Sequence, residues 1–103
     1  MKKYIIERNF PGAGNMTSEE LQVISKTSNA VVSIMGNPYV WIESFVTENK
    51  IYCIHEAVNE EDIIEHGKCG GFPVDKIEEI KAVIGPATGN QYSVIVCYPA
   101  IIK

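Results

Sequence analysis

Three side chains with metal-binding atoms are spaced along a short stretch that we expect to be helical. Asp62 and His66 lie four residues apart, and His66 and Cys69 lie three apart. Because residues at these spacings share a helix face, the carboxylate, the imidazole and the thiol should point to the same side. Imidazole combined with carboxylate or thiolate suits nickel, zinc or copper. The competing interpretation is a surface pair of Asp62 and His66 near the helix C-terminus, where the dipole favours a positive imidazole.

Two further carboxylates belong to a predicted β-hairpin. Segments 39–47 and 50–57 are rich in β-branched and aromatic residues and are separated by two residues, which predicts a two-residue turn. Because side chains alternate along a strand, this register defines two faces. The first face is mixed and comprises Trp41, Glu43, Phe45, Tyr52, Ile54 and Glu56. The second face is small and aliphatic and comprises Val40, Ile42, Ser44, Val46, Ile51, Cys53, His55 and Ala57.

Catalysis is the alternative chemistry. Glu7, Arg8 and Tyr52 could meet the two hairpin carboxylates above the mixed face, where burial would raise a carboxylate's pKa and allow proton transfer. Nothing in the spacing requires this, and no Cys-His-Asn order predicts a cysteine nucleophile. His55 lies on the aliphatic face and is interpreted as a buried scaffold residue. The sequence therefore favours a binding protein over an enzyme.

The elements that position these groups follow the order β-α-β-β-α-β. A strand is predicted over 3–10, and a helix over 18–35 follows the capping-box pattern Thr17-Ser-Glu-Glu20. After the hairpin, a helix capped by Asn59 ends near Cys69, and residues 76–84 are assigned to a strand, with a helix as the competing assignment. In this strand Ile80, Ala82 and Ile84 would alternate inward. The order is that of the α+β ferredoxin-like fold, with a four-stranded antiparallel sheet and two helices on one face.

Such a fold leaves one sheet face without helices. Trp41, Phe45 and Tyr52 are expected on that face, and an apolar patch of this kind normally marks an interface. We therefore expect a homodimer. The alternatives are a small-molecule enzyme or ligand-binding domain that uses this face as a cavity lined by Trp41, Tyr52 and Glu56, and a structural or regulatory interaction module. Residues 1–88 form the predicted domain, and residues 89–103 form an extension that would add a fifth strand to it or to a partner.

The composition narrows the classes of partner. The chain has 103 residues and a net charge of −4 with scattered cations, which argues against nucleic-acid binding. Its apolar runs are far shorter than the roughly 20 residues that span a bilayer, and no secretory apolar core follows Met1, so we expect a cytoplasmic protein without a membrane partner. Three cysteines without a CxxC pair indicate reduced thiols.

Three segments carry a family resemblance: KYIIERNFPGAG, WIESFVTENKIYCIHEA and NEEDIIEHGKCGGFPVDKIEEIKAVIGPAT. Over about residues 3–88 they resemble, in this order, a bacterial family of small domains of unknown function. Its best-described members are called nickel-binding proteins with a ferredoxin-like fold and a dimeric state. Relatives often carry a histidine where Glu43 stands, and His66 stands at a matching histidine. The resemblance implies Ni²⁺, or else Zn²⁺ or Cu²⁺, with Glu43, Glu56 and His66 as first candidates for ligands and Asp62 and Cys69 as weaker ones.

Overall fold

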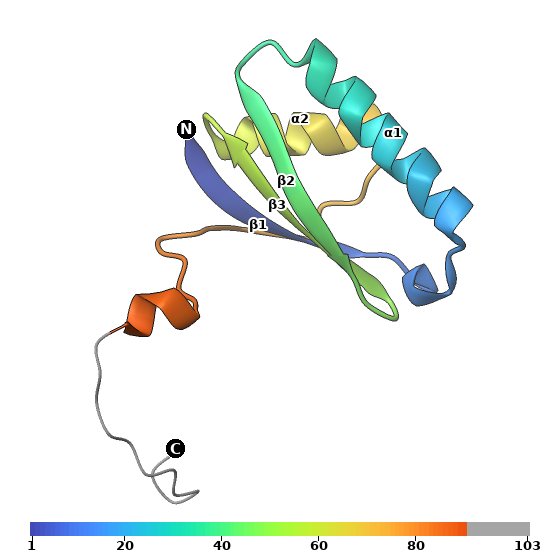
Figure 1. The fold of residues 1–103 in the computed structure, drawn as a ribbon. Helices are drawn as coiled ribbons and strands as arrows, with labels where there is room; N and C mark the ends of the chain where they lie inside the picture. Colours follow the sequence, from blue (N-terminus) through green and yellow to red (C-terminus); the bar gives the residue numbers. More distant parts are fainter. Residues whose placement is uncertain (91–103) are drawn as a thin grey trace, which may run out of the picture.

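Four strands form one antiparallel sheet in the order β2-β3-β1-β4. In the computed structural model, which describes residues 1–90, these are β1 (Lys2–Asn9), β2 (Tyr39–Val46), β3 (Lys50–Ala57) and β4 (Lys76–Glu79). Both helices cover the same face of the sheet (Figure 1). The strand order and the one-sided helix layer confirm the predicted ferredoxin-like fold. We call the sheet face without helices the open face.

The first helix, α1 (Ser18–Ile34), begins where the capping box predicts. The Thr17 side chain accepts a hydrogen bond from the Glu20 N–H at 3.1 Å, and the Glu20 carboxylate accepts one from the Thr17 N–H at 2.9 Å. Each hydrogen bond satisfies a backbone donor that has no partner within the helix. The local sequence therefore determines the residue at which the helix begins.

The second helix, α2 (Glu60–Gly70), is also capped at both ends. The Asn59 side chain accepts from the backbone N–H of Asp62 at 3.0 Å, and the helix ends at Gly71 with φ of 71°, a left-handed conformation that glycine adopts without strain. Two short 3-10 helices, η1 (Ala13–Asn15) and η2 (Pro86–Gly89), complete the elements. Among the helices of residues 1–90, none combines the length and apolar character needed to cross a membrane.

Strand β2 departs from the simple alternation that the sequence predicts. Trp41 lies opposite His55, whereas Glu43 lies opposite Ile54, the preceding residue of the antiparallel partner β3. Ile42 is therefore an extra residue in β2 without a paired residue in β3, and it forms a β-bulge. From Glu43 to Val46 the hairpin follows the predicted register, and the Thr47 N–H donates to the Lys50 carbonyl at 2.9 Å.

The bulge corrects the predicted faces at the start of β2. Trp41 pairs with the buried His55 and lies on the helix-covered face, not on the open face. Val40 pairs with Glu56 and lies on the open face, not in the aliphatic set. The alternation along a strand has a period of two, so one inserted residue exchanges the faces on either side of it.

The fourth strand is shorter than predicted. It pairs with β1 from Lys76 to Glu79, and the Ile80 N–H donates to the Lys3 carbonyl at 2.8 Å. Because β1 begins at Lys2, few backbone partners remain beyond this point. The predicted inward positions of Ala82 and Ile84 are therefore wrong, and the Ile84 side chain is 80% exposed. The predicted fifth strand over 91–102 lies outside the described residues.

The core lies between the sheet and the helices. Its most buried side chains include Ile6 of β1 and Ile63 of α2, both 0% exposed.

Replacing Ile63 with alanine should lower the free energy of unfolding by about 2–5 kcal/mol, because the surrounding core cannot collapse fully into the space. The matched control is Ile64→Ala, since the Ile64 side chain is 42% exposed and its loss should cost less than about 1 kcal/mol. Urea denaturation followed by circular dichroism measures both, and equal losses would contradict the inward face assigned to α2.

Candidate functional site

The sheet separates the residues that the sequence suggests as metal ligands. Glu43 and Glu56 lie on the open face. Asp62 and His66 point inward from α2, where they are 7% and 1% exposed, and Cys69 is exposed on the same helix. Within residues 1–90, no three histidine, cysteine, aspartate or glutamate side chains gather closely enough to hold a metal ion. The structure thus provides two separate places to examine, one on each side of the sheet.

Asp62 has a structural partner of its own. Its Oδ2 atom accepts a hydrogen bond from Asn37 Nδ2 at 3.0 Å, and its backbone N–H is capped by Asn59. The carboxylate therefore ties the start of α2 to the segment that precedes β2. The surface pair of Asp62 and His66, the competing interpretation of their spacing, is wrong because both side chains are buried.

On the open face, Glu43 and Glu56 are diagonal neighbours. Glu43 lies opposite Ile54, and Glu56 is two residues further along β3, a spacing at which long side chains can reach one another. Glu56 also lies opposite Lys3 in β1. Even so, no ion pair within the described part of the chain involves Glu43 or Glu56.

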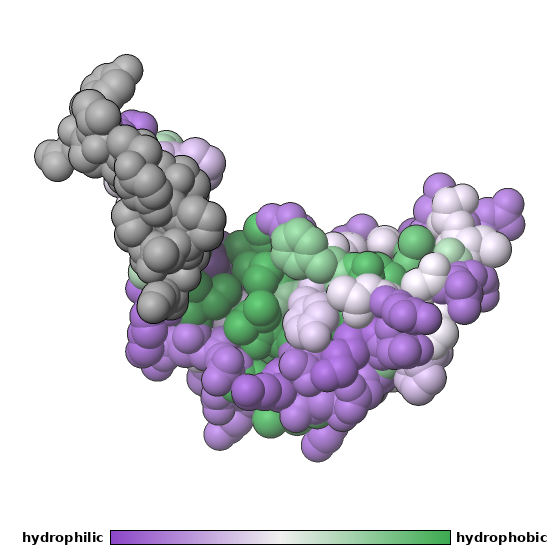
Figure 2. Space-filling view, turned by 90° about the horizontal axis from the view of Figure 1, so that it is seen from below, coloured by the Kyte–Doolittle hydropathy of each residue, from purple (hydrophilic) through white to green (hydrophobic). Residues whose placement is uncertain are grey.

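Apolar side chains surround these two carboxylates. In Figure 2 hydrophobic residues gather in the middle of the visible face, with hydrophilic residues around them. The open-face positions of β2 include Val40 and Phe45, whose side chains are 39% and 52% exposed. Two ion pairs lie elsewhere on this face, Lys50 with Glu7 at 3.0 Å and Lys76 with Glu78 at 3.8 Å; both are at least partly exposed and contribute little to stability.

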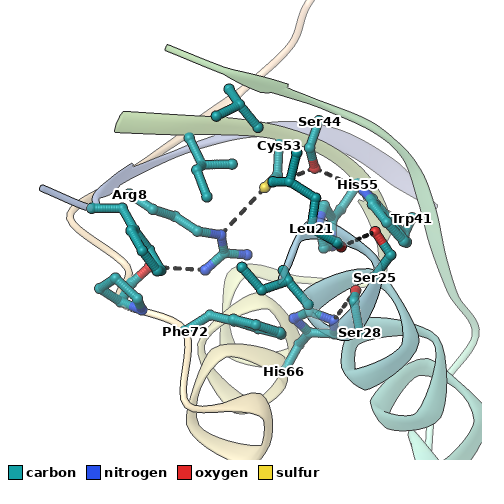
Figure 3. A pocket seen from close by; sticks show the side chains of 15 residues that line it. Arg8, Leu21, Ser25, Ser28, Trp41, Ser44, Cys53, His55, His66 and Phe72 are labelled. Carbon is teal, nitrogen blue, oxygen red and sulfur yellow. Dashed lines mark hydrogen bonds between the residues drawn. The ribbon is translucent and has the colours of Figure 1, made fainter. Parts of the chain in front are cut away.

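A cavity of about 190 Å³ lies on the other side of the sheet, beneath the helices (Figure 3). We call it the helix-side cavity. Its polar lining residues are Arg8, Ser25, Ser28, Ser44, Cys53, His55 and His66. Its apolar lining residues are Phe10, Leu21, Ile24, Trp41, Val46, Ile51, Phe72 and Pro73. The predicted cavity lined by Trp41 on the open face is therefore misplaced, because the bulge turns Trp41 toward the helices.

Arg8 supplies the positive charge of the cavity wall. Its side chain is 3% exposed; Nε donates to Cys53 Sγ at 3.3 Å and Nη1 donates to the Pro73 carbonyl at 2.9 Å. The guanidinium carbon lies 5.6 Å from the centroid of the Phe72 ring, within the range of a cation–π contact. In Figure 3 the guanidinium lies between Cys53 and Phe72.

A second chain of hydrogen bonds ends at the same sulfur atom. Trp41 Nε1 donates to Ser44 Oγ at 2.9 Å, and Ser44 Oγ donates to Cys53 Sγ at 3.0 Å. The sulfur therefore accepts from a hydroxyl and from the Arg8 guanidinium at once. Cys53, interpreted from the sequence as a small core residue, is the point where β1, β2 and β3 are joined through polar groups.

Helix α2 comes unusually close to the loop that carries Phe72. A Cβ atom added at Gly67 would lie 2.7 Å from Val74 Cγ2 and 3.0 Å from the Phe72 carbonyl oxygen. The same Cβ would lie 3.7 Å from Arg8 Nη1. Glycine at this position lets the helix backbone approach the loop and close the cavity beside the guanidinium.

Both histidines of the chain meet at the wall of this cavity. The ring centroids of His55 and His66 are 4.9 Å apart. The Tyr39 hydroxyl shares a hydrogen bond of 2.6 Å with His55 Nδ1, and the Tyr39 ring stacks on His66 at 5.1 Å. Ser28 Oγ lies 3.1 Å from His66 Nε2, while the buried His66 Nδ1 has no hydrogen-bond partner among the described residues. His55 is thus a satisfied buried residue, as expected, but it also borders the cavity.

Burial keeps both imidazoles neutral near pH 7. The loss of hydration lowers the pKa of His55 from its ordinary 6.5 to about 3, helped by the neighbouring His66 and Arg8. It lowers the pKa of His66 from 6.5 to about 4, helped by Arg8. Burial also raises the pKa of the Tyr39 hydroxyl, which stays protonated.

Sequence reasoning missed this cluster because it placed Arg8 on the open face beside Glu7. Neighbouring residues of a strand point to opposite faces, so Glu7 and Arg8 cannot meet above the same face. The signal was present in the row Tyr4, Ile6 and Arg8, which continues an inward apolar row into a charged residue. An arginine in such a row indicates a buried charge that needs partners.

Fold and site together define a small ferredoxin-like α+β domain with a polar cavity under its helices. The chain belongs to the SCO4226-like family, described as nickel responsive protein SCO4226-like, whose model matches residues 4–80.

The fold is also that of a solved relative. The crystal structure of SCO4226 from Streptomyces coelicolor A3(2) superimposes with a TM-score of 0.68 at 18% sequence identity. The match covers 80% of this chain and 99% of that one. At this identity the likeness describes the fold alone. No curated protein matches the chain.

The neutral histidines make stability depend on pH. Between pH 6.5 and about 4, the unfolded chain binds protons on both histidines while the folded chain does not. The histidine contribution is therefore complete above pH 6.5 and is lost as the pH falls toward the lowered pKa values, by on the order of 1.4 kcal/mol per pH unit for each histidine. Urea denaturation at pH 7, 6 and 5 measures this slope.

The variant His66→Gln tests the assignment. It removes one of the two titrating histidines, so the slope below pH 6.5 should fall by the contribution of one histidine, on the order of 1.4 kcal/mol per pH unit. Carboxylates contribute equally to wild type and variant, and their contribution cancels in the comparison. An unchanged slope would show that His66 is not buried in its neutral form.

Proposed function

We propose that this protein binds a divalent transition metal ion, with nickel first, on the open face of a homodimer. The observation that carries the proposal is the adjacent pair of carboxylates, Glu43 and Glu56, which share an exposed face and have no ion-pair partner within residues 1–90. The description of the family as nickel responsive supports the choice of ion. Zinc and copper are the next candidates, because they stand beside nickel in the general order of divalent affinities, in which copper binds more tightly than nickel.

The ion is assigned to the open face because the cavity is unsuited to a cation. The Arg8 guanidinium lies in the cavity wall and already lowers the pKa values of both histidines by repelling positive charge. His66 is 1% exposed, and its Nε2 atom is held by Ser28. Of the suggested ligands, Glu43 and Glu56 therefore form the metal-binding pair of this proposal, while His66, Asp62 and Cys69 do not.

A second copy of the chain completes the site. Two carboxylates are fewer ligands than a divalent ion needs, and a two-fold interface brings the same surface of both copies together. It would add a second Glu43–Glu56 pair and cover the exposed Val40 and Phe45 side chains. The divalent ion would then offset two of the four negative charges that the two carboxylate pairs bring to the interface.

Nickel titration tests the carboxylate pair. Isothermal titration calorimetry of the metal-free protein with Ni²⁺ should show binding tighter than about 100 μM. The double variant Glu43→Gln/Glu56→Gln should weaken binding by about tenfold or more, because it removes ligand charge without changing side-chain size. Parallel titrations with Zn²⁺ and Cu²⁺ rank the ions.

The matched controls are Glu78→Gln and His66→Gln. Glu78 lies on the same face, opposite Ile5 at the other edge of the sheet, so its loss changes the net charge without touching the pair. His66→Gln removes the buried imidazole. Both variants should bind Ni²⁺ like wild type. Absence of binding below 100 μM, or an unaffected Glu43→Gln/Glu56→Gln variant, would contradict the proposal.

The homodimer is tested by sedimentation velocity at micromolar concentration. Wild type should sediment as a dimer, and Phe45→Glu should sediment as a monomer, because it places a charge in the proposed apolar interface. The control is Val23→Glu on α1, whose side chain is 63% exposed on the helix layer; this variant should remain dimeric. A monomeric wild type, or a dimer broken only by Val23→Glu, would show that the open face is not the interface.

A further inference from the structure

The helix-side cavity contains a buried charge that no carboxylate within residues 1–90 neutralises. Arg8 is 3% exposed, and no ion pair within residues 1–90 includes it. Residues 91–103 contain no aspartate or glutamate that could supply a side-chain partner. An isolated buried charge is costly, and buried charges in proteins are normally paired.

The guanidinium keeps donors free for a ligand. It carries five N–H groups, and it cannot lose its charge in a protein. The structure assigns protein acceptors to Nε and Nη1, namely Cys53 Sγ and the Pro73 carbonyl. Within the described residues, Nη2 has no such acceptor. A carboxylate is the group whose two oxygens match a guanidinium edge.

Charge and size limit the ligand further. Among the described residues, the other ionisable bases in the wall are His55 and His66, and burial keeps both neutral. The cavity therefore offers one positive charge, which suits a monoanion. Its volume of about 190 Å³ exceeds the 150 Å³ of an engineered cavity that holds benzene, so a ligand of benzoate size fits. Apolar walls from Leu21, Ile24 and Phe72 suit an apolar body.

We propose that the helix-side cavity binds a small monocarboxylic acid with an apolar body, whose carboxylate is held by Arg8. His66 is a second polar residue of the wall, and its buried Nδ1 atom has no hydrogen-bond partner in residues 1–90. This site is independent of the metal proposal, since Glu43 and Glu56 lie across the sheet from it.

A competing source of negative charge is the sulfur of Cys53. It accepts hydrogen bonds from Arg8 and from Ser44, so a thiolate here would neutralise the guanidinium. In that case the cavity would have no preference for an anion over a neutral molecule of the same shape. The comparison of such a pair of molecules therefore separates the two explanations.

The chain provides its own reporter, because Trp41 is its single tryptophan and lies in the cavity wall. Sodium benzoate, benzyl alcohol and inorganic phosphate are titrated separately into the full chain at pH 7 and constant ionic strength, with Trp41 fluorescence as the readout. Benzoate should give a saturable change with a Kd below about 1 mM. Benzyl alcohol should bind at least about tenfold more weakly, because its hydroxyl carries no charge to pair with the guanidinium. Phosphate should also bind at least about tenfold more weakly, because it has no apolar body to fill the cavity.

The variant Arg8→Met replaces the charge by an apolar side chain of similar length. It should lose the preference for benzoate over benzyl alcohol, whereas Lys76→Met, which removes an exposed charge on β4, should keep it. Folding of each variant is checked by circular dichroism, and the wild-type ligand comparison decides if Arg8→Met does not fold. For wild type, the proposal is overturned if benzoate and benzyl alcohol bind equally, if phosphate binds more tightly than benzoate, or if benzoate does not bind at concentrations up to about 10 mM. It is also overturned if folded Arg8→Met keeps the full preference for benzoate over benzyl alcohol.

Discussion

A single inserted residue in β2 decides which side chains of this domain can meet. Residues three apart in a regular strand point to opposite faces, yet Trp41 and Ser44 share a hydrogen bond of 2.9 Å. They can do so because Ile42 is bulged out between them. The bulge turns the tryptophan toward the helices while Glu43 faces the opposite side. The polar network of the cavity depends on this irregularity, whereas the carboxylate pair of the open face follows from the regular pairing of Glu43 with Ile54.

The sheet then acts as a barrier between two electrostatic environments. On one side, Glu43 and Glu56, which have no ion pair within residues 1–90, lie among apolar side chains at a surface. On the other, a guanidinium and two neutral imidazoles line a cavity beneath the helices. Strand alternation keeps these two carboxylates and the guanidinium on opposite faces, so they cannot pair with one another. The two faces therefore differ in the sign of the ligand that we expect them to attract.

Sequence reasoning recovered what local chemistry controls. The helix that begins after Thr17 and the turn between Thr47 and Lys50 are specified within a few residues, and both are confirmed. No glycine or proline lies at the bulge to mark it in the sequence, so the local pattern of residues does not predict that Trp41 turns toward the helix-covered face. The contact between His55 and His66 is not predicted from the sequence for a related reason. It depends on how α2 docks on β3, and no local spacing encodes that contact.

The glycine at position 67 shows what this docking costs. Glycine in a helix interior is about 1 kcal/mol less favourable than alanine, so Gly67→Ala would be a usual choice for strengthening α2 in a search for a more thermostable protein. Here the added methyl group would lie 2.7 Å from Val74 and 3.0 Å from the Phe72 carbonyl. The helix would have to move away from the loop that places Phe72 against Arg8. At this position close packing takes the place of helix propensity. A stability screen guided by propensity alone would therefore choose a substitution that disturbs the wall of the helix-side cavity.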